Sequence, residues 1–591
     1  MKKLQEAITR CTARQAVECT MKSWDGSELF YRAWLPAGPS DQAVLLFHRG
    51  HEHSGRWQEV VDRLDLPDVA MFAWDARGHG RSTGARGYAD SFMCLERDVD
   101  AFVRHVSETY RIPISNMVVL AQSVGSVVVS AWVHDYAPPI RAMVLSVPAL
   151  RVKLYVPFAV PLMRLWQAFQ PVAFVQSYVK ARMLTHDEVQ AQAYREDPLI
   201  TRAIAVNILL GLYETSTRLM QDAAAIRTPT LMLGAGADWV VELGAQRRFF
   251  DGLGSPVKEW RVCPGFYHDI FHEQERHLPI ENAREFILAA FTRATTPPSL
   301  LQADRDSFTQ REYEALSSPL PWFSPRRLGF TALRLAMRTV GRLSQGVRIG
   351  WRTGFDSGET LNYVYEDRAR GWTPLGRLMD RIYLDGVGWK GIRHRKLNVE
   401  RLLRRAVQEV HAAKGRARIL DVASGSGRYV LDTLARSRHL ECSALLRDRS
   451  VSAIEEGRQL AQERNMTHVT FEQGDAFDRE SLASVSPRPD IGIVSGLYEL
   501  FPDNARVLES LKGLHDAIEP GGYLIYTNQP WHPQLEMIAR VLLNRDGQPW
   551  IMRRRTQEEM DDLVRAAGFE KCAMAVDEGG IFTVSLARKR S

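Results

Sequence analysis

The chain has 591 residues, of which 45% are hydrophobic and 25% are charged, and its formal net charge is +6 at pH 7. A chain of this length is too long for one hydrophobic core, so we expect two to four domains. The composition is typical of a soluble globular protein, and so small a basic excess gives no case for nucleic-acid binding.

The spacing of the cysteines and the nature of the first residues indicate the cellular compartment in which we expect the protein. The six cysteines form no Cys-x-x-Cys pair, which fits a reducing compartment without disulfides or a zinc site, so no metal is expected. The segment Met1–Glu6 is polar and lacks the apolar core of a signal peptide, and no run of about 18 apolar residues could span a membrane. We therefore expect a cytoplasmic protein.

In the first half of the chain, apolar runs predict a sheet. Residues 15–36 predict a hairpin that turns at Asp25-Gly26. Continuous apolar runs predict buried strands, and the segment 94–110 predicts a helix between two of them. Because strands that alternate with helices form a parallel sheet, we expect the site at the carboxyl ends of the strands. The predicted buried strands cover residues 43–47, 69–74, 117–121, 141–146 and 229–234.

The stretch 117–129 predicts a strand, a tight turn and a helix of small residues, with Ser123 at the apex. Such a strained turn needs small residues two positions away on either side, and Ala121 and Gly125 supply them. The usual motif is Gly-x-Ser-x-Gly, so Ala121 is a mild departure. A serine hydroxyl needs a base at neutral pH, and the base needs a carboxylate that fixes its tautomer.

Further motifs in the first half resemble the α/β-hydrolases of the monoacylglycerol lipase and serine aminopeptidase type, over about residues 15–290. The sequence Glu-His-Ser-Gly-Arg at 52–56 matches the end of that family's oxyanion loop, and residues 75–82 match Asp-x-x-Gly-His-Gly-x-Ser. The resemblance implies a catalytic triad in the order nucleophile, acid, base. The matching residues are Ser123, Asp238 and His268.

A tetrahedral oxyanion needs two backbone N–H donors, which we assign to Val124, after the nucleophile, and Gly50, in the loop after the first buried strand. The family usually has glycine directly after the loop histidine. Here Arg49 stands between His48 and Gly50.

Between residues 146 and 226 the strand pattern stops. The segments 154–166 and 169–179 are apolar, aromatic and helical in period. In the family that the chain resembles, an insertion at this place covers the active site as a lid, here about residues 150–225. An apolar lid suits an acyl chain or a membrane surface, and the alternative is a packed cap with no role in lipid binding.

Two breaks rich in proline and serine, at 295–299 and 317–325, predict a linker over residues 295–394. Its segment Arg326–Arg352 carries seven arginines and no acid, and three of them share one face of a predicted helix. A basic amphipathic helix can lie on anionic membrane, where each charge contributes about 1 kcal/mol. The alternative is a helix docked between domains, and nucleic-acid binding is a poorer third. The three arginines are Arg334, Arg338 and Arg342.

The second half begins with a predicted helix over 399–413, followed by a strand, a loop with two glycines and a helix over 417–430. A glycine loop at the end of a first strand lets a ligand approach the backbone closely. By itself this loop could also belong to a dinucleotide-binding domain. Further strands are predicted within residues 442–446, 469–477, 490–496, 518–526 and 582–587.

This order of elements resembles a class I S-adenosylmethionine-dependent methyltransferase over about residues 395–590. Glu-Pro-Gly-Gly before the fifth strand and Gly-Asp-Ala after the third favour that family over a dinucleotide-binding one. The resemblance implies that S-adenosylmethionine is held by the glycine loop, by an acid at the ribose and by an acid at the adenine edge. The loop residues are Asp421, Ala423, Gly425 and Gly427, with Ala423 in place of the usual first glycine, and the two acids are Asp448 and Asp475.

No base for the methyl acceptor stands out in the sequence. Tyr498 and Glu499 follow the fourth strand, where a substrate would sit, but they also suit an ordinary helix start. A second acid at the ribose position, usual in many members of the family, is absent, because Arg449 follows Asp448.

We therefore predict two α/β domains: an α/β-hydrolase with a helical lid at 1–294 and a Rossmann-like class I methyltransferase at 395–591. The predicted activities are hydrolysis of a carboxylic ester, preferably an acyl-glycerol or lysophospholipid-like ester, and methyl transfer from S-adenosylmethionine. The alternatives are a small-ester carboxylesterase, a thioesterase or a peptidase with an unrelated methyltransferase, or a silent lipid-binding domain that places the methyltransferase at a membrane. Both domains are hypothesised to act on one lipid-related class of substrate.

Overall fold

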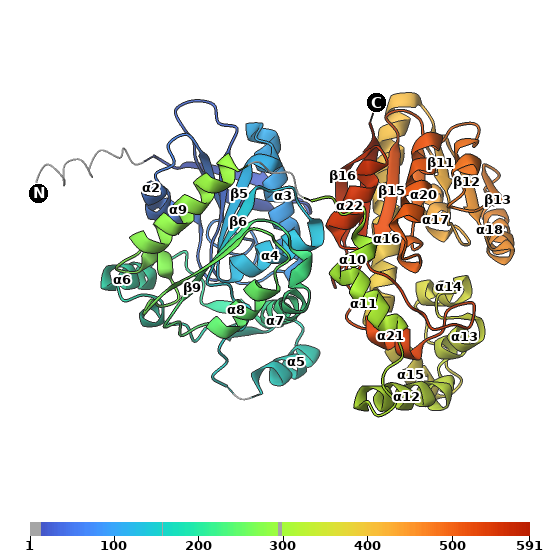
Figure 1. The fold of residues 1–591 in the computed structure, drawn as a ribbon, viewed down its shortest axis with the longest axis horizontal. Helices are drawn as coiled ribbons and strands as arrows, with labels where there is room; N and C mark the ends of the chain where they lie inside the picture. Colours follow the sequence, from blue (N-terminus) through green and yellow to red (C-terminus); the bar gives the residue numbers. More distant parts are fainter. Residues whose placement is uncertain (1–13, 157, 294–297, 591) are drawn as a thin grey trace, which may run out of the picture. The chain divides into compact units, whose positions relative to one another are not determined.

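The computed structural model describes residues 14–156, 158–293 and 298–590. The chain forms two compact units, Met1–Pro297 and Pro298–Ser591, each built on its own sheet (Figure 1). The α/β fold class predicted from the sequence is confirmed in both units. Within the described ranges, no helix is both long enough and apolar enough to cross a membrane.

Unit 1 is built on an eight-stranded sheet with the strand order β1-β2-β4-β3-β5-β6-β9-β10. β2 pairs antiparallel with β1 and β4, and the remaining neighbours are parallel. The half-exposed edge strand β10 is not among the strands predicted from apolar runs, because charged residues interrupt it. The strands are β1 (Val17–Lys22), β2 (Glu28–Trp34), β3 (Ala43–Phe47), β4 (Ala70–Trp74), β5 (Met117–Gln122), β6 (Ala142–Ser146), β9 (Thr230–Ala235) and β10 (Lys258–Cys263).

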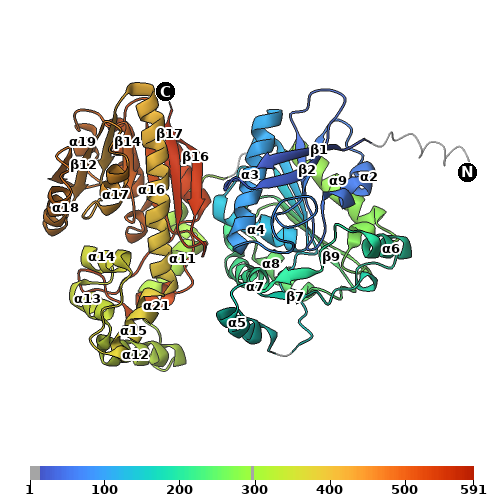
Figure 2. The ribbon, with the colours of Figure 1, turned by 180° about the vertical axis from the view of Figure 1, so that it is seen from behind.

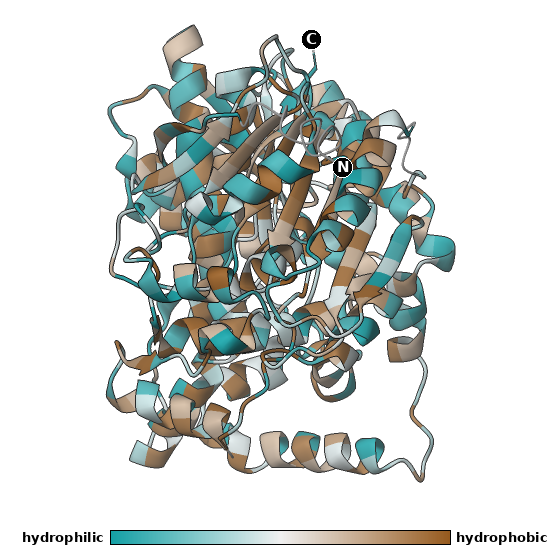
Figure 3. Ribbon diagram, turned by 90° about the vertical axis from the view of Figure 1, so that its left-hand side faces the viewer, coloured by the Kyte–Doolittle hydropathy of each residue, from teal (hydrophilic) through white to brown (hydrophobic). Residues whose placement is uncertain are grey.

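The apolar strands of unit 1 are buried on both faces of the sheet. Along β3, Val44 and Leu46 share a core with helices α2 and α9. Phe47 points to the opposite face and meets Phe102 of α3, with ring centroids 6.1 Å apart. In Figure 3 the strands are mostly brown along their length, whereas the helices alternate between brown and teal. The main helices are α2 (Gln58–Leu64), α3 (Phe92–Tyr110), α4 (Val124–Tyr136), α8 (Leu243–Gly252) and α9 (His277–Thr292).

The insertion between β6 and β9 is largely helical and stands where the sequence predicts a lid. β7 and β8 form a small antiparallel sheet of their own. Helix α5 buries none of its residues, and Phe169 at its end is 83% exposed. The insertion contains α5 (Ala159–Phe169), β7 (Phe174–Gln176), α6 (Glu188–Glu196), β8 (Ala203–Ala205) and α7 (Val206–Gln221).

Unit 2 is built on a seven-stranded sheet with the strand order β13-β12-β11-β14-β15-β17-β16, in which β17 is antiparallel to both of its neighbours. The first five strands are parallel, in the Rossmann-like order that the resemblance implies. The strands are β11 (Ala417–Asp421), β12 (Cys442–Asp448), β13 (Val469–Gln473), β14 (Ile491–Val494), β15 (Tyr523–Asn528), β16 (Phe569–Val576) and β17 (Thr583–Lys589).

Helices cover both faces of this second sheet. α16, α17 and α18 contribute to the core on one face, and α20 and α22 to the core on the other. The long helix α16 begins well before the predicted residue 399 and runs beside β16 and β17 (Figure 2). The helices are α16 (Val387–Lys414), α17 (Arg428–Arg436), α18 (Val451–Glu463), α20 (Asn504–Ala517), α21 (Leu535–Val541) and α22 (Gln557–Ala566).

Residues 295–394 depart from the predicted linker. From residue 298 onward they fold into helices that belong to the same compact unit as the sheet. Ile349 and Leu384 lie in one buried cluster with Trp389 of α16 and with residues of α21. The division between the two units falls within the first break, at 295–299, as predicted. The second break, at 317–325, separates short helices instead of ending a domain, because residues of α11 and α13 on its two sides share one buried cluster. These helices are α10 (Ala303–Asp306), α11 (Phe308–Ser317), α12 (Pro325–Arg338), α13 (Gln345–Thr353), α14 (Gly358–Glu366) and α15 (Pro374–Leu384).

The basic stretch Arg326–Arg352 also lacks the continuous basic face that its spacing predicts. Helix α12 ends at Arg338, so Arg342 lies in the next, separate turn. The Arg334 guanidinium donates hydrogen bonds to two carbonyl oxygens at the end of α21, at 2.8 and 3.2 Å. The Arg338 guanidinium lies over an indole ring of α13, 4.8 Å from its centroid. Two of the three aligned arginines therefore contact unit 2 itself.

Candidate active sites

Ser123 stands at the turn between β5 and α4. Its backbone angles, φ 54° and ψ −114°, are strained for a residue other than glycine. Hydrogen bonds hold this conformation: the Ser123 N–H donates to the carbonyl oxygen of Ser146 at 2.8 Å, and the Ala149 N–H donates to that of Ser123 at 3.1 Å. A side chain at Gly125 would bring its Cβ to 2.5 Å from the carbonyl oxygen of His48, so only glycine fits there.

His268 lies between Ser123 and Asp238. Its Nε2 is 2.8 Å from the Ser123 Oγ, and its Nδ1 is 2.8 Å from Oδ2 of Asp238. The other oxygen of Asp238 accepts the N–H groups of Val240 at 2.6 Å and Val241 at 3.0 Å. Burial opposes ionisation, but His268 and these N–H groups outweigh it and lower the pKa of Asp238 on balance. An ionised carboxylate at Nδ1 keeps the imidazole proton there, so the lone pair of Nε2 faces the serine.

The two residues assigned to the oxyanion hole lie close to each other. A Cβ built on Gly50 would lie 3.3 Å from Cγ2 of Val124. The loop after β3 therefore meets the N-terminus of α4, directly beside Ser123.

A buried charged network joins the three segments that carry these residues. Arg49 donates to Glu52 at 2.8 Å and lies 3.5 Å from Asp269, and all three side chains are buried. Asp269 also accepts from Gln122 Nε2 at 3.0 Å and is bonded to His272 Nδ1 at 2.9 Å. Gln122 precedes the serine, Asp269 follows the histidine of the triad, and Arg49 precedes the oxyanion loop glycine. In the sequence, Arg49 stands out only as a departure from a motif. The signal for this pair is that a positive charge lies next to Gly50 and a negative charge, Asp269, next to His268.

In unit 2 the glycine loop between β11 and α17 contacts the acid at the end of β12. The N–H groups of Gly425 and Ser450 each donate to a different oxygen of Asp448, both at 2.8 Å. Gly425 and Gly427 have φ values of 56° and 71°, the left-handed region that favours glycine. A Cβ on Gly427 would collide with the side chain of Leu446, whereas one on Gly425 would meet no described atom within 4 Å. Because Gly427 has no side chain, Leu446 can pack against it. Gly425 leaves open space beside Asp448.

The two other predicted cofactor acids lie at the ends of β11 and β13. Asp421 is fully buried and accepts the Tyr429 hydroxyl at 2.5 Å and the Ala423 N–H at 3.3 Å; burial raises its pKa to about 7. Asp475 is exposed and accepts the Phe477 N–H at 2.9 Å. The N–H of the residue before Asp475 donates to the last carbonyl oxygen of β12 at 3.1 Å. The predicted cofactor residues therefore lie along one edge of the sheet.

Helix α14 adds a contact to the glycine loop that the sequence did not predict. The Ser426 hydroxyl donates to the Asn362 side chain at 3.4 Å, and Asn362 also bonds Glu456 of α18. This contact was missed because residues 358–366 fell inside the predicted linker.

The side chains of Tyr498 and Glu499 lie in different surroundings in the structure. The Tyr498 hydroxyl is bonded to the Ser510 Oγ at 2.9 Å inside the core. Glu499 instead lines a cavity and lies 3.4 Å from the Arg395 guanidinium. Of the two residues, only Glu499 is placed to meet a ligand.

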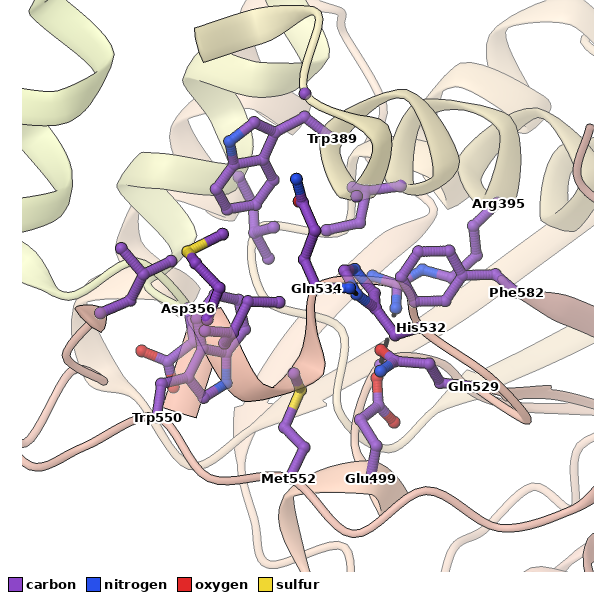
Figure 4. A pocket seen from close by; sticks show the side chains of 18 of the residues that line it. Asp356, Trp389, Arg395, Glu499, Gln529, His532, Gln534, Trp550, Met552 and Phe582 are labelled. Atoms are coloured by element: carbon purple, nitrogen blue, oxygen red, sulfur yellow. Dashed lines mark hydrogen bonds and ion pairs between the residues drawn. The ribbon is translucent and has the colours of Figure 1, made fainter. Parts of the chain in front are cut away.

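This cavity, of about 240 Å³, lies at the ends of β14 and β15. In Figure 4 the side-chain ends of Arg395, Glu499 and His532 gather on one side, and Trp389 and Trp550 lie on the other. The two indole rings are nearly parallel, with centroids 6.3 Å apart. The cavity is therefore an apolar, aromatic space with a small polar end.

Comparisons with known proteins agree with both halves. The family model described as "Putative methyltransferase" matches residues 283–589, and the model described as "Serine aminopeptidase, S33" matches residues 38–275. The hydrolase and methyltransferase resemblances seen in the sequence are thereby confirmed.

Relatives match either the whole chain or the first unit. "Uncharacterized protein YnbC" of Escherichia coli K12 is 50% identical over 570 residues, which are 96% of this chain and 97% of that protein. "Monoacylglycerol lipase" of Mycolicibacterium smegmatis and "Phospholipase YtpA" of Bacillus subtilis are each 28% identical, over 45% and 41% of this chain and 94% and 93% of their own. The chain belongs to the same family as YnbC and to the family described as "Putative methyltransferase", and in this chain the region that matches the S33-type α/β hydrolases comes first.

Proposed function

We propose that unit 1 hydrolyses carboxylic esters through a serine acyl-enzyme. The observation that carries this proposal is the line of hydrogen bonds from Ser123 through His268 to Asp238 at a strained strand-to-helix turn. The Ser123 Oγ attacks the ester carbonyl carbon as its proton passes to Nε2 of His268, and Asp238 stabilises the imidazolium. His268 then protonates the leaving alcohol, and the same imidazole activates the water that releases the acid.

In this proposal the N–H groups of Gly50 and Val124 bind the oxyanion. The closeness of these two residues to each other beside the serine supports it.

The preferred substrate is an acyl-glycerol or lysophospholipid-like ester. Helix α5 supports this choice because it presents large apolar side chains to solvent: Leu162, Leu165 and Phe169 are 55%, 58% and 83% exposed. An apolar face of this kind suits an acyl chain. The names of two relatives, a monoacylglycerol lipase and a phospholipase, point the same way.

A fluorophosphonate probe should label the wild type and leave Ser123→Ala unlabelled, because the probe reacts with the activated hydroxyl. His268→Ala should lose most of the labelling, since the serine then lacks its base. Ser452→Ala, at an exposed position of α18, is the matched control. Equal labelling of the wild type and Ser123→Ala would refute the hydrolase proposal.

A chain-length series of nitrophenyl esters tests the preference for long acyl chains.

We further propose that unit 2 binds S-adenosylmethionine and transfers its methyl group. When bound, this cofactor supplies a methyl group on a sulfonium centre. The open space at Gly425 beside the Asp448 carboxylate fits the ribose hydroxyls, and the exposed Asp475 fits the adenine edge. Asp421, Ala423 and the Gly425–Gly427 backbone are assigned to the methionine part.

Calorimetry should detect binding of S-adenosylhomocysteine, and Asp448→Ala should weaken it about 10- to 100-fold, the loss expected for hydrogen bonds to a carboxylate. Because Asp448 also holds the glycine loop, Asp475→Ala is the second variant, and it should weaken binding without a change in thermal unfolding. Glu480→Ala, at an exposed position of α19 (Arg479–Ala483), is the control. Failure of the wild type to bind would refute the cofactor assignment.

We still propose that the stretch Arg326–Arg352 attaches the protein to anionic membrane, but through a different set of arginines from the three that the sequence predicts. Arg334 and Arg338 contact unit 2, whereas Arg342 and Arg352 line a surface hollow together with Trp351. Salt-sensitive sedimentation with anionic vesicles, lost in a variant with Arg342 and Arg352 replaced by alanine, tests it. Location in the cytoplasm likewise stays a prediction.

A further inference from the structure

We propose that the cavity of unit 2 binds a neutral hydroxyl group carried by an apolar molecule, and that Glu499 takes the proton of that hydroxyl as its oxygen is methylated. The inference rests on the methyltransferase function proposed above and adds to it the class of methyl acceptor. Three properties of the cavity lining carry it: the pairing of its charges, its unpaired donors and the second carboxylate oxygen of Glu499.

The charges of the lining are already paired with one another. The Glu499 Oε1 lies 3.4 Å from Arg395. Asp356 accepts from the backbone N–H of Arg545 at 2.6 Å and from its guanidinium at 3.2 Å. No further acidic or basic side chain is among the lining residues that the structure describes, apart from His532, whose ring is neutral. A charged ligand would therefore be buried without a counter-charge from the protein, which is unfavourable in an apolar space, so a neutral ligand is favoured.

His532 is a hydrogen-bond donor toward the cavity. Its Nδ1 accepts the backbone N–H of Gln534 at 3.0 Å, so the proton of the neutral ring is on Nε2. Burial lowers the pKa of His532 to about 4, which keeps the ring neutral at pH 7. The Nε2 lies beside Gly388, where a Cβ would approach it to 2.8 Å. The ring therefore cannot take a proton from a substrate, but it can donate a hydrogen bond to a substrate oxygen.

Gln529 supplies a second donor. This residue lines the cavity and is 2% exposed, and its Nε2 has no hydrogen-bond partner among the described residues. A buried N–H group without a partner is destabilising, so an acceptor on a ligand in the cavity would be favourable there.

Glu499 is the acceptor at the same end. Its Oε1 is paired with Arg395, and within the described residues no hydrogen bond or ion pair reaches Oε2. Arg395 is itself fixed, because its guanidinium lies over the Phe582 ring at 4.9 Å and packs against Gly496. A hydroxyl group both donates and accepts, so it can satisfy Glu499 together with His532 or Gln529. A carboxylate cannot donate to Glu499, and an ammonium cannot accept from the two donors.

The step balances without a further reactant. A lone pair of the hydroxyl oxygen forms the bond to the methyl carbon, and the proton of that hydroxyl moves to Oε2 of Glu499. The bond from the methyl carbon to the sulfur of a sulfonium donor breaks, and its electron pair goes to sulfur. The positive sulfonium and the negative carboxylate thereby become a neutral thioether and a neutral carboxylic acid, which later returns its proton to water.

Four naphthalene compounds with one apolar body and different head groups test the inference by calorimetry on the full chain at pH 7, with and without S-adenosylhomocysteine. We expect 2-naphthol or 2-naphthalenemethanol to bind at least about tenfold more tightly than 2-naphthoate and 2-naphthylmethylammonium. The pair 1-decanol and decanoate shows whether the apolar body is aromatic or aliphatic. Equal or tighter binding of the carboxylates or of the ammonium compound would overturn the inference.

Glu499→Gln keeps the size of the side chain and removes the base. Labelled methyl transfer to the better hydroxyl probe should fall about 100-fold or more, with Glu480→Gln unchanged. An unaltered rate in Glu499→Gln would overturn the role of Glu499. The ligand series uses only the wild type, so its result does not depend on whether a variant folds. If S-adenosylhomocysteine binds and no hydroxyl compound does, the acceptor inference fails and the cofactor proposal stands. If hydroxyl compounds bind and S-adenosylhomocysteine does not, the preference for hydroxyl groups stands and the methyltransferase proposal fails.

Discussion

Replacing Asp238 with asparagine is expected to lower kcat for ester hydrolysis by about four orders of magnitude, the loss known for this substitution in serine proteases. The N–H groups of Val240 and Val241 both point at Oδ1, so the amide oxygen of asparagine would occupy that side. Its NH2 group would then face Nδ1 of His268. A donor there requires the lone pair of Nδ1, so the imidazole proton moves to Nε2 and faces Ser123. Nε2 of His268 then carries a proton and cannot accept the proton of the Ser123 hydroxyl.

Steady-state kinetics with a nitrophenyl ester measures this loss. Asp251→Asn, at an exposed position of α8, is the control and should keep the wild-type kcat. Because the asparagine keeps the shape and the two backbone hydrogen bonds, thermal unfolding of Asp238→Asn should stay near that of the wild type. A kcat within tenfold of the wild-type value would show that Asp238 does not set the tautomer of His268.

Replacing Arg49 with alanine is expected to lower the free energy of unfolding of unit 1 by about 3–5 kcal/mol, the range for breaking a buried ion pair from one side. The guanidinium is 2% exposed and lies within 3.5 Å of both Glu52 and Asp269. Its removal leaves two buried carboxylates short of a counter-charge. Since Asp269 follows His268 directly, fluorophosphonate labelling should fall as well.

Denaturant unfolding at several pH values measures this effect. Burial opposes ionisation of Asp269, but His272 and Arg49 outweigh it and hold its pKa below the ordinary range. A carboxyl group whose pKa is lowered by folding stabilises the protein above its unfolded-state pKa of about 4, and this contribution is lost as the pH falls. The deficit of Arg49→Ala should therefore be larger at pH 7 than at pH 3.

The control for the Arg49 prediction is Arg63→Ala, which removes a half-exposed guanidinium paired with Glu59. Pairs of this kind contribute about 0–1 kcal/mol, so the free energy of unfolding should hardly change. Adding Glu52→Gln to Arg49→Ala should recover part of the loss. An equal effect of Arg49→Ala and Arg63→Ala would contradict the proposed network.

Much of each sheet could be predicted because the signals are local. The buried strands of unit 1 are continuous apolar runs, and Ser123 stands in a turn whose small neighbours are required by direct contact with the backbone of His48. Asp448 could be predicted because it ends an apolar strand beside a glycine loop. For Ser123 the sequence signal lies within a few positions of the residue, although the contacts that hold the turn come from more distant residues.

The remaining features depend on contacts between distant segments. The pairing of Arg49 with Asp269 and the lining of the cavity by α16 and the loop after β15 are contacts of that kind. The proline and serine breaks before α12 look the same in a linker and in a helical subdomain. What distinguishes the two is the burial of side chains such as Ile349 and Leu384, which depends on partners more than a hundred residues away.

The shared cluster of α11, α13, α15, α16 and α21 determines where the chain can be cut. A fragment beginning at residue 395, just ahead of the glycine loop, would lack Ile349, Leu384 and Trp389 and would expose their partners on α21. Apolar surface of that extent promotes aggregation, so inactivity of such a fragment would reflect its folding and not its chemistry. A fragment beginning at residue 298 keeps the cluster whole. A fragment made to test the second unit by itself therefore has to begin before α11, whose Leu316 belongs to this cluster.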